Sequence, residues 1–144
     1  MVCLGNICRS PLAEGILKHK TKNLSIFIDS AGTASYHIGS LPDSRSIKIA
    51  SKYGIDLTGQ RARQFLEKDF DEFDKIYAMD TDNYANIIAL ARNQSDKNKV
   101  DVILNELYPE SYSSVPDPYY GAGDGFQTVY DMLDKACDKI VDKL

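Results

Sequence analysis

Short apolar runs and helical apolar stripes alternate along the chain, and this alternation predicts its secondary structure. Apolar runs that end in glycine or polar residues are typical of buried strands, whereas apolar positions spaced three or four apart are typical of helices. The predicted strands are residues 1–2, 25–29, 75–79 and 100–104. The predicted helices are residues 11–20, 43–53, 81–92 and 126–141. We therefore expect an α/β fold of three layers, in which a parallel sheet of four strands has helices on both faces.

Polar residues at the ends of the predicted strands are the first indication of a site. Cys3, Asp29 and Asp80 each stand at or directly after the end of such a strand. In open parallel sheets, ligands bind beyond the carboxyl ends of the strands. We therefore expect these residues, together with a later loop around Asp117, to gather at one edge of the sheet.

Residues 3–9 (CLGNICR), here called the Cys3 loop, connect the first predicted strand to the first predicted helix. Gly5 and Asn6 are residue types that tolerate left-handed backbone angles. Ser10 is a favoured helix N-cap, and Pro11 is favoured at the first helical position. A loop that closes on a helix N-terminus directs several backbone N–H groups to one point, where it binds an anion such as phosphate.

Cys3 and Arg9 stand at the two ends of this loop, and their side chains turn an anion site into a reaction site. The positive surroundings that bind phosphate also favour the thiolate form of cysteine. The planar guanidinium matches two phosphate oxygens at once. Since a thiolate that faces a bound phosphoryl group is oriented for in-line attack, we predict Cys3 as nucleophile and Arg9 as phosphate ligand.

Composition narrows the class of protein. The 144 residues, 43% hydrophobic and 26% charged, are typical of one globular domain over residues 1–144. A net charge of −4 argues against a nucleic-acid partner, and the absence of a long apolar run or signal-peptide pattern argues against a membrane. Three cysteines, two of them in the Cys3 loop, favour a reducing cytoplasm over a disulfide framework. His19 and His37 lack the spacing of metal ligands, so we expect no metal.

Residues 3–11 (CLGNICRSP) resemble the phosphate-binding loop of the low-molecular-weight protein tyrosine phosphatases. Later segments resemble later blocks of that family, in the same order: 29–33 (DSAGT), 62–64 (ARQ), 78–80 (AMD) and 115–121 (VPDPYYG). The resemblance spans essentially the whole chain and implies a phosphotyrosine phosphatase I-like fold, whose first strand lies inside the sheet. Only Met1 and Val2 precede Cys3, where the family has a full strand. We therefore expect a truncated first strand and a natural chain that begins a few residues earlier.

The resemblance also implies a mechanism that needs neither cofactor nor metal. The family hydrolyses protein phosphotyrosine and small aryl phosphates through a phosphocysteine intermediate, which assigns Cys3 as the nucleophile. Asp117 matches the family's general acid, which then acts as the base that activates water. Without the resemblance, an aspartate between Pro116 and Pro118 is more typical of a structural turn.

The same correspondence names residues around the substrate. Tyr119 and Tyr120 are expected to form cleft walls that stack on the substrate's ring, the alternative being that they pack their loop onto the core. Tyr36 occupies the position of another specificity residue, in a loop that varies among family members. The residues expected to surround the phosphate are Leu4, Gly5, Asn6, Ile7, Cys8 and Ser10.

Other residues are expected to support the Cys3 loop. Ser10 would donate its hydroxyl to the Cys3 thiolate, and Asn6 and Ser30 would brace the strained backbone. Where many family members have histidine, this chain has Gln60, so the imidazole brace is absent or is replaced by the amide.

The other two cysteines have different expected roles. Cys8 either traps oxidised Cys3 as a disulfide, in line with the reversible inactivation of the family, or is a small buried thiol beneath the loop. Cys137 falls on the apolar stripe of the last predicted helix, and we expect it in the core.

Rival functions differ from a phosphotyrosine phosphatase in specific residues. Protein arginine phosphatases share the scaffold but tend to have threonine in place of Ile7, whose bulkier side chain favours an aryl phosphate. Thioredoxin-coupled arsenate reductases need a further cysteine pair, and no cysteine occurs between Arg9 and Ala136. An inactive phosphotyrosine-binding module would need neither Cys3 nor Asp117. We therefore expect a cytoplasmic phosphotyrosine phosphatase that acts on phosphoproteins and is a monomer or associates weakly with itself.

Overall fold

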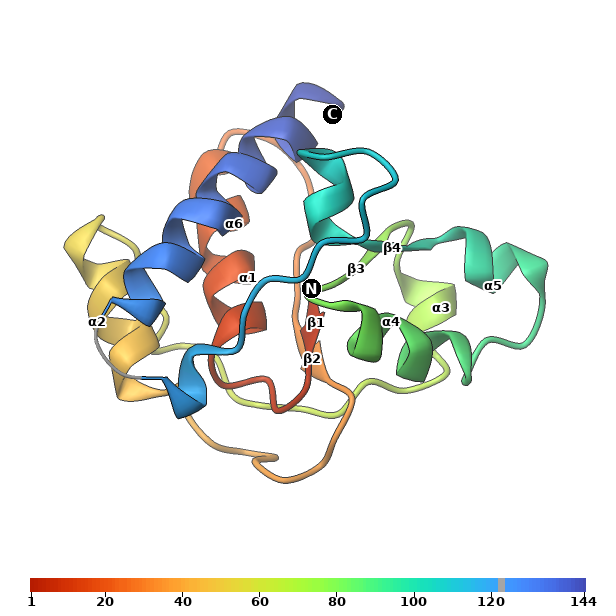
Figure 1. The fold of residues 1–144 in the computed structure, drawn as a ribbon, viewed down its shortest axis with the longest axis horizontal. Helices are drawn as coiled ribbons and strands as arrows, with labels where there is room; N and C mark the ends of the chain where they lie inside the picture. Colours follow the sequence, from red (N-terminus) through yellow and green to blue (C-terminus); the bar gives the residue numbers. More distant parts are fainter. Residues whose placement is uncertain (122–123) are drawn as a thin grey trace.

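A parallel four-stranded sheet forms the centre of the computed structural model, which describes residues 1–121 and 124–144 without the side chain of Tyr120 (Figure 1). The strands are β1 (Val2–Cys3), β2 (Ala31–Gly32), β3 (Ile76–Ala78) and β4 (Val100–Val102). Their order across the sheet is β2-β1-β3-β4, and each neighbouring pair is parallel. The predicted parallel sheet with a short first strand in its interior is therefore confirmed.

Helices cover both faces of the sheet and give the predicted three layers (Figure 1). On one side lie α1 (Arg9–Lys20), α2 (Ser44–Lys52) and α6 (Gly125–Asp142). On the other lie α3 (Asp69–Glu72), α4 (Thr81–Ile88) and α5 (Gln94–Asn98). Two 3-10 helices, η1 (Ile103–Glu106) and η2 (Pro118–Tyr120), follow β4. Within the described residues, none of these helices is both long and apolar enough to cross a membrane.

The strands divide their side chains between two hydrophobic cores. Val2, Ile76 and Ala78 belong to the core on the α4 side, whereas Cys3 and Tyr77 belong to the larger core beneath α1 and α6. This division follows from the alternation of side chains along a strand. The larger core seats α1 against the sheet, so the N-terminus of α1 lies at the carboxyl end of β1.

The contact between α1 and α6 is the main helix–helix contact of the larger core. Leu12 of α1 and Leu133 of α6 are fully buried there, and burial of each leucine contributes about 1.5–3 kcal/mol to stability. Cys137 is also fully buried in this core, as predicted. Its thiol therefore lies among core side chains.

The second predicted strand is wrong in position. Residues 25–29 have no regular secondary structure, and Phe27 in their middle is 74% exposed. Pairing with the first strand is limited to a short stretch, in which the N–H of Ala31 donates to the carbonyl of Met1 (3.0 Å) and the terminal ammonium of Met1 donates to the carbonyl of Asp29 (3.1 Å). The ladder between β1 and β2 joins only Val2 with Ala31 and Cys3 with Gly32, so residues 25–29 lie outside the sheet.

The helix predicted for residues 81–92 is shorter than expected. α4 ends at Ile88, and α5 begins after Asn93, whose side chain accepts a hydrogen bond from the N–H of Asp96 (2.8 Å). Asparagine is a favoured N-cap, so a separate helix, which was not predicted, begins at Gln94. The other predicted elements agree with the structure to within two residues at each end.

Candidate active site

The Cys3 loop runs from the carboxyl end of β1 into the first turn of α1. Of the two residue types that tolerate left-handed angles, Asn6 adopts one (φ 56°) and Gly5 does not. The loop rests on β2 at Gly32, where a Cβ atom would lie 2.8 Å from the carbonyl oxygen of Leu4 and 3.1 Å from the amide nitrogen of Asn6. This close approach requires glycine at position 32.

Ser10 is not the N-cap of α1, contrary to expectation. The helix begins at Arg9, and Cys8 stands at the N-cap position without a side-chain capping bond. Pro11 is accordingly the third helical residue rather than the first. Because Ser10 lies within the first turn, its hydroxyl is free to face the nucleophile, and its Oγ lies 3.0 Å from Sγ of Cys3.

A pocket over the Cys3 loop brings most of the predicted residues together. Cys3, Arg9 and Asp117 all line it, although they come from three separate parts of the chain. The predicted substrate contacts in its lining are Leu4, Gly5, Ile7, Cys8, Tyr36 and Tyr119. Sequence reasoning missed His37, which also lines the pocket with its ring 6.4 Å from that of Tyr119. A histidine in a predicted loop carries no periodic signal that marks it as a pocket residue.

Arg9 is held rigidly at the floor of this pocket. Its side chain is only 3% exposed, and Nη1 donates to Oδ2 of Asp80 (2.6 Å) and to the carbonyl of Val115 (3.0 Å). Nη2 lies 3.6 Å from Oδ2 of Asp117, and the buried Nε has no hydrogen-bond partner among the described residues. The Nε–Nη2 edge of the guanidinium is therefore the edge that can receive two oxygens of an anion.

Asp117 faces Arg9 across the pocket, and hydrogen bonds hold both its carboxyl group and its loop. Its Oδ1 accepts a hydrogen bond from the N–H of Tyr119 (3.0 Å), which orients the carboxyl group. Arg45 of α2 donates to the carbonyl of Tyr119 (3.3 Å), and its guanidinium lies 4.7 Å from the ring centre of Phe126. Tyr119 is half-exposed, as a cleft wall requires; the side chain of Tyr120 lies outside the described structure.

A buried hydrogen-bond network supports the loop from below, and it contains the three predicted braces. Nδ2 of Asn6 donates to Oγ of Ser10 (2.8 Å) and to Oγ of Ser30 (2.9 Å), while Oδ1 of Asn6 accepts from the N–H of Arg63 (3.0 Å). Ser30 in turn donates to Oε1 of Glu14 (2.6 Å). Sequence reasoning missed Glu14, although its place among the apolar residues of the first helix was a signal.

Cys8 is a buried thiol with a raised pKa. Burial is the main cause, with a further contribution from the nearby charge of Asp43, and together they raise the pKa of Cys8 to about 12. All three cysteines are free thiols in the structure. The two interpretations of Cys8, redox partner and packing residue, both stay predictions.

The side chain of Gln60 forms its hydrogen bond with α1 and not with the Cys3 loop. Its Nε2 donates to the carbonyl of Pro11 (3.0 Å), within the first turn of α1, and its buried Oε1 has no partner among the described residues. The amide therefore anchors the helix that follows the loop, while Asn6 itself is held by the backbone of Arg63.

Comparison with known proteins agrees with this geometry. The sequence pattern of the family described as low molecular weight phosphotyrosine protein phosphatase matches residues 1–144. The chain belongs to this family. A Synechocystis relative with the family's name is 46% identical over 149 residues, which cover 99% of this chain and 93% of the relative. The expected family, and with it the expectation of a phosphatase, is confirmed.

Solved structures share the fold of this phosphatase closely. A protein tyrosine phosphatase from Entamoeba histolytica is 40% identical with a TM-score of 0.91, covering 99% of this chain and 92% of that one. The Drosophila arginine phosphatase is 31% identical with a TM-score of 0.90, covering 99% of this chain and 95% of that one. Since both names occur on one fold, the choice between a phosphate ester of tyrosine and a phosphoramidate of arginine depends on the side chains of the pocket.

Proposed function

We propose that this phosphatase hydrolyses protein phosphotyrosine through a phosphocysteine formed on Cys3. The observation that carries the proposal is the Arg9 guanidinium in the pocket that Cys3 also lines: its buried Nε has no hydrogen-bond partner among the described residues, and its Nη2 lies 3.6 Å from Oδ2 of Asp117. A phosphoryl group seated on the Nε–Nη2 edge and on the loop amides would lie within reach of the Cys3 sulfur. The names of the relatives, which are protein tyrosine phosphatases, support the same activity.

In the first step, the Cys3 thiolate attacks phosphorus from the side opposite the phenolic oxygen. The S–P bond forms as the P–O bond to tyrosine breaks, and protonated Asp117 gives its proton to the departing oxygen. The hydroxyl of Ser10, 3.0 Å from the sulfur, stabilises the thiolate before attack. The Arg9 guanidinium stabilises the charge on the transferring oxygens.

In the second step, the roles of Asp117 and Cys3 reverse. Asp117, now ionised, takes a proton from a water molecule whose oxygen attacks phosphorus. The S–P bond breaks, inorganic phosphate leaves, and the thiolate of Cys3 is restored. One residue serves both steps because the leaving oxygen and the attacking water occupy the same side of the phosphoryl group.

The pocket favours an aryl phosphate over a guanidino phosphate. Its rim carries the rings of Tyr36, His37 and Tyr119, which are suited to stacking on a phenyl ring, and Ile7 adds an apolar wall. A guanidino group would place its charged nitrogens against this apolar wall. Arsenate reduction by a cysteine cascade is disfavoured because it needs a further cysteine pair, whereas the one cysteine outside the loop, Cys137, is fully buried.

The proposed substrate class is tested with matched peptides that carry phosphotyrosine or phosphoarginine at the same position, in EDTA. We expect phosphate release from the phosphotyrosine peptide and at least about tenfold slower release from the phosphoarginine peptide. Ile7→Thr is the matched variant, and it should narrow the preference. Faster release from phosphoarginine would overturn the proposed substrate, and no release from either peptide by folded protein would favour a binding module.

A further inference from the structure

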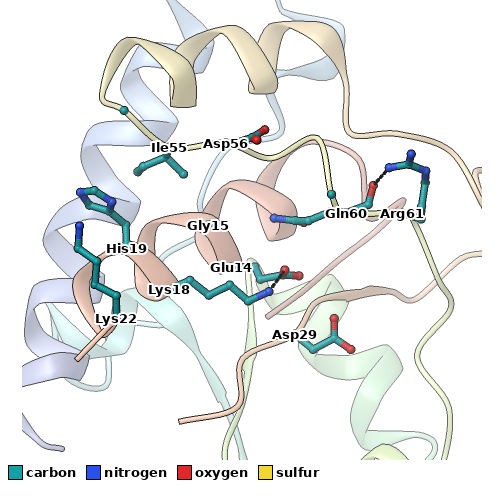
Figure 2. A pocket seen from close by; sticks show the side chains of 12 residues that line it. Glu14, Gly15, Lys18, His19, Lys22, Asp29, Ile55, Asp56, Gln60 and Arg61 are labelled. Carbon is teal, nitrogen blue, oxygen red and sulfur yellow. Dashed lines mark hydrogen bonds and ion pairs between the residues drawn. The ribbon is translucent and has the colours of Figure 1, made fainter. Parts of the chain in front are cut away.

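Glu14 is a buried carboxylate that the proposed mechanism does not use. Only 4% of the residue is exposed, and its two oxygens have different partners on opposite sides. Oε1 accepts from the hydroxyl of Ser30 (2.6 Å), toward the protein interior. Oε2 accepts from Nζ of Lys18 (2.8 Å), whose side chain is half-exposed, and both residues line a pocket of about 540 Å³ (Figure 2).

The carboxylate fixes the direction of the hydrogen bond to Ser30. An ionised carboxylate is an acceptor only, so the single hydroxyl proton of Ser30 must point at Glu14. The lone pairs of Ser30 Oγ are then free to accept, and Nδ2 of Asn6 donates to them at 2.9 Å. Glu14 thus presents an acceptor to Asn6 through one intervening hydroxyl.

Asn6 connects Ser30 to Ser10, whose hydroxyl contacts the nucleophile. Its Oδ1 accepts from the backbone N–H of Arg63, so its Nδ2 hydrogens face Ser30 and Ser10. Since Ser10 Oγ receives a hydrogen from Asn6, its own proton is left for Sγ of Cys3 at 3.0 Å; the alternative acceptor, the carbonyl of Ala31, is farther away at 3.4 Å. The hydrogen bonds therefore diverge from Asn6, toward Ser30 and Glu14 on one side and toward Ser10 and Sγ of Cys3 on the other.

We propose that Glu14 is a positioning residue for the Cys3 thiolate, acting through Ser30, Asn6 and Ser10. This rests on the proposed function only in that Cys3 reacts as a thiolate. Glu14 keeps Ser30 as an acceptor, Ser30 helps to hold Asn6 in its left-handed conformation, and Asn6 directs the Ser10 proton to the sulfur. Loss of this order withdraws a hydrogen bond from the charged form of Cys3.

The proposal makes a prediction opposite in sign to simple electrostatics. Removal of a negative charge near a thiol favours the thiolate, so by charge alone Glu14→Gln would make Cys3 react faster with an alkylating agent at low pH. By our proposal Cys3 reacts more slowly there. Other charged groups facing Glu14, namely Asp29, the Met1 ammonium and Arg63 bonded to Asp29, are the same in both proteins and do not affect the comparison.

Lys18 decides how the new amide would orient. In Glu14→Gln, the ammonium of Lys18 attracts the amide oxygen, so the NH₂ group faces Ser30 and donates where the carboxylate accepted. Lys18→Met leaves the carboxylate in place and should have little effect, because the exposed half of this ion pair is screened by solvent. Combined with Glu14→Gln, Lys18→Met frees the amide to turn its oxygen toward Ser30.

The test is the pH dependence of Cys3 alkylation by iodoacetamide, read by peptide mass spectrometry. Relative to wild type, we expect the midpoint to rise by about one unit in Glu14→Gln, which is a tenfold loss of thiolate at low pH. It should be unchanged in Lys18→Met and partly restored in the double variant. Thermal melting by circular dichroism checks the fold, and Ser30→Ala, also expected to raise the midpoint, replaces Glu14→Gln if that variant does not fold.

The outcomes separate this proposal from the proposed function. An unchanged or lowered midpoint in Glu14→Gln, or in Ser30→Ala in its place, overturns the positioning role. No restoration in the double variant also contradicts it, since a purely structural loss would not depend on Lys18. If wild type fails to hydrolyse phosphotyrosine yet the midpoint rises as expected, the positioning role stands and the proposed function fails.

Discussion

Nη1 of Arg9 lies 2.6 Å from Oδ2 of Asp80, and this ion pair ties the Cys3 loop to the end of the neighbouring strand β3. The other carboxyl oxygen of Asp80 accepts from the N–H of Asn83 (2.7 Å), so the same residue caps α4. One carboxylate thus orients the guanidinium and begins a helix. As a result, the Nε–Nη2 edge faces the pocket.

Asp80→Asn is expected to lower kcat/KM for an aryl phosphate about tenfold to hundredfold. Asparagine can still cap α4, but it removes the charge from the bond that orients Arg9, which is a loss of about 1.5–3 kcal/mol for a hydrogen bond to a charged group. Asp82→Asn, an exposed change in the same turn of α4, is the matched control and should leave kcat/KM unchanged. Equal kinetics of both variants would mean that Asp80 does not orient Arg9.

Gly32→Ala is expected to reduce kcat about a hundredfold while the protein still folds. The added Cβ would lie 2.8 Å from the carbonyl oxygen of Leu4, so the Cys3 loop must shift, and a displacement of about 1 Å at a reaction site has an effect of this size. Gly59→Ala is the control, because a Cβ at position 59 meets nothing within 4 Å. Measurements of kcat and thermal melting curves of the two variants check the prediction. Normal turnover of Gly32→Ala would show that the Cys3 loop tolerates a Cβ at position 32.

The order of elements and the place of the Cys3 loop between β1 and α1 could be predicted from sequence, although the residue at which α1 begins could not. Asparagine tolerates left-handed backbone angles, and Asn6 adopts them. Cys3 and Arg9 line one pocket, as predicted. The position of β2 could not be predicted in this way, since an apolar run around Phe27 becomes a strand only if another strand lies beside it. Glu14 and His37 escaped notice because burial and pocket contacts are set by distant segments of the chain.

Alkaline pH is expected to destabilise the folded protein through its buried thiols. Burial raises the pKa of Cys8 to about 12, and that of Cys137 likewise to about 12, both from an ordinary 9.0. Unfolded thiols lose their protons above about pH 9 while the folded ones keep theirs, so the free energy of unfolding falls as pH rises from 9 toward 12. Urea titrations at pH 8 and pH 10.5 should show this fall, and a smaller one in Cys8→Ala. An equal fall in both proteins would mean that Cys8 does not contribute.

The same raised pKa predicts selective chemistry at neutral pH. Iodoacetamide at pH 7.5 should modify Cys3 in the folded protein and leave Cys8 and Cys137 unmodified, because only thiolates react. Peptide mapping after brief exposure measures the three sites separately. Modification of Cys8 at a rate similar to that of Cys3 would contradict its description as a buried, protonated thiol.

Capture of the phosphocysteine is the most direct measurement of the central claim. The substrate is para-nitrophenyl phosphate, whose leaving group needs little proton donation, so the first step proceeds in Asp117→Asn. This variant lacks the base for the second step, so the intermediate should accumulate. After an acid quench, we expect one phosphoryl group per chain, located by mass spectrometry on Cys3, together with a burst of about one nitrophenol per enzyme. A variant that turns over without phosphorylating Cys3, or a Cys3→Ser protein that keeps wild-type activity, would contradict the mechanism.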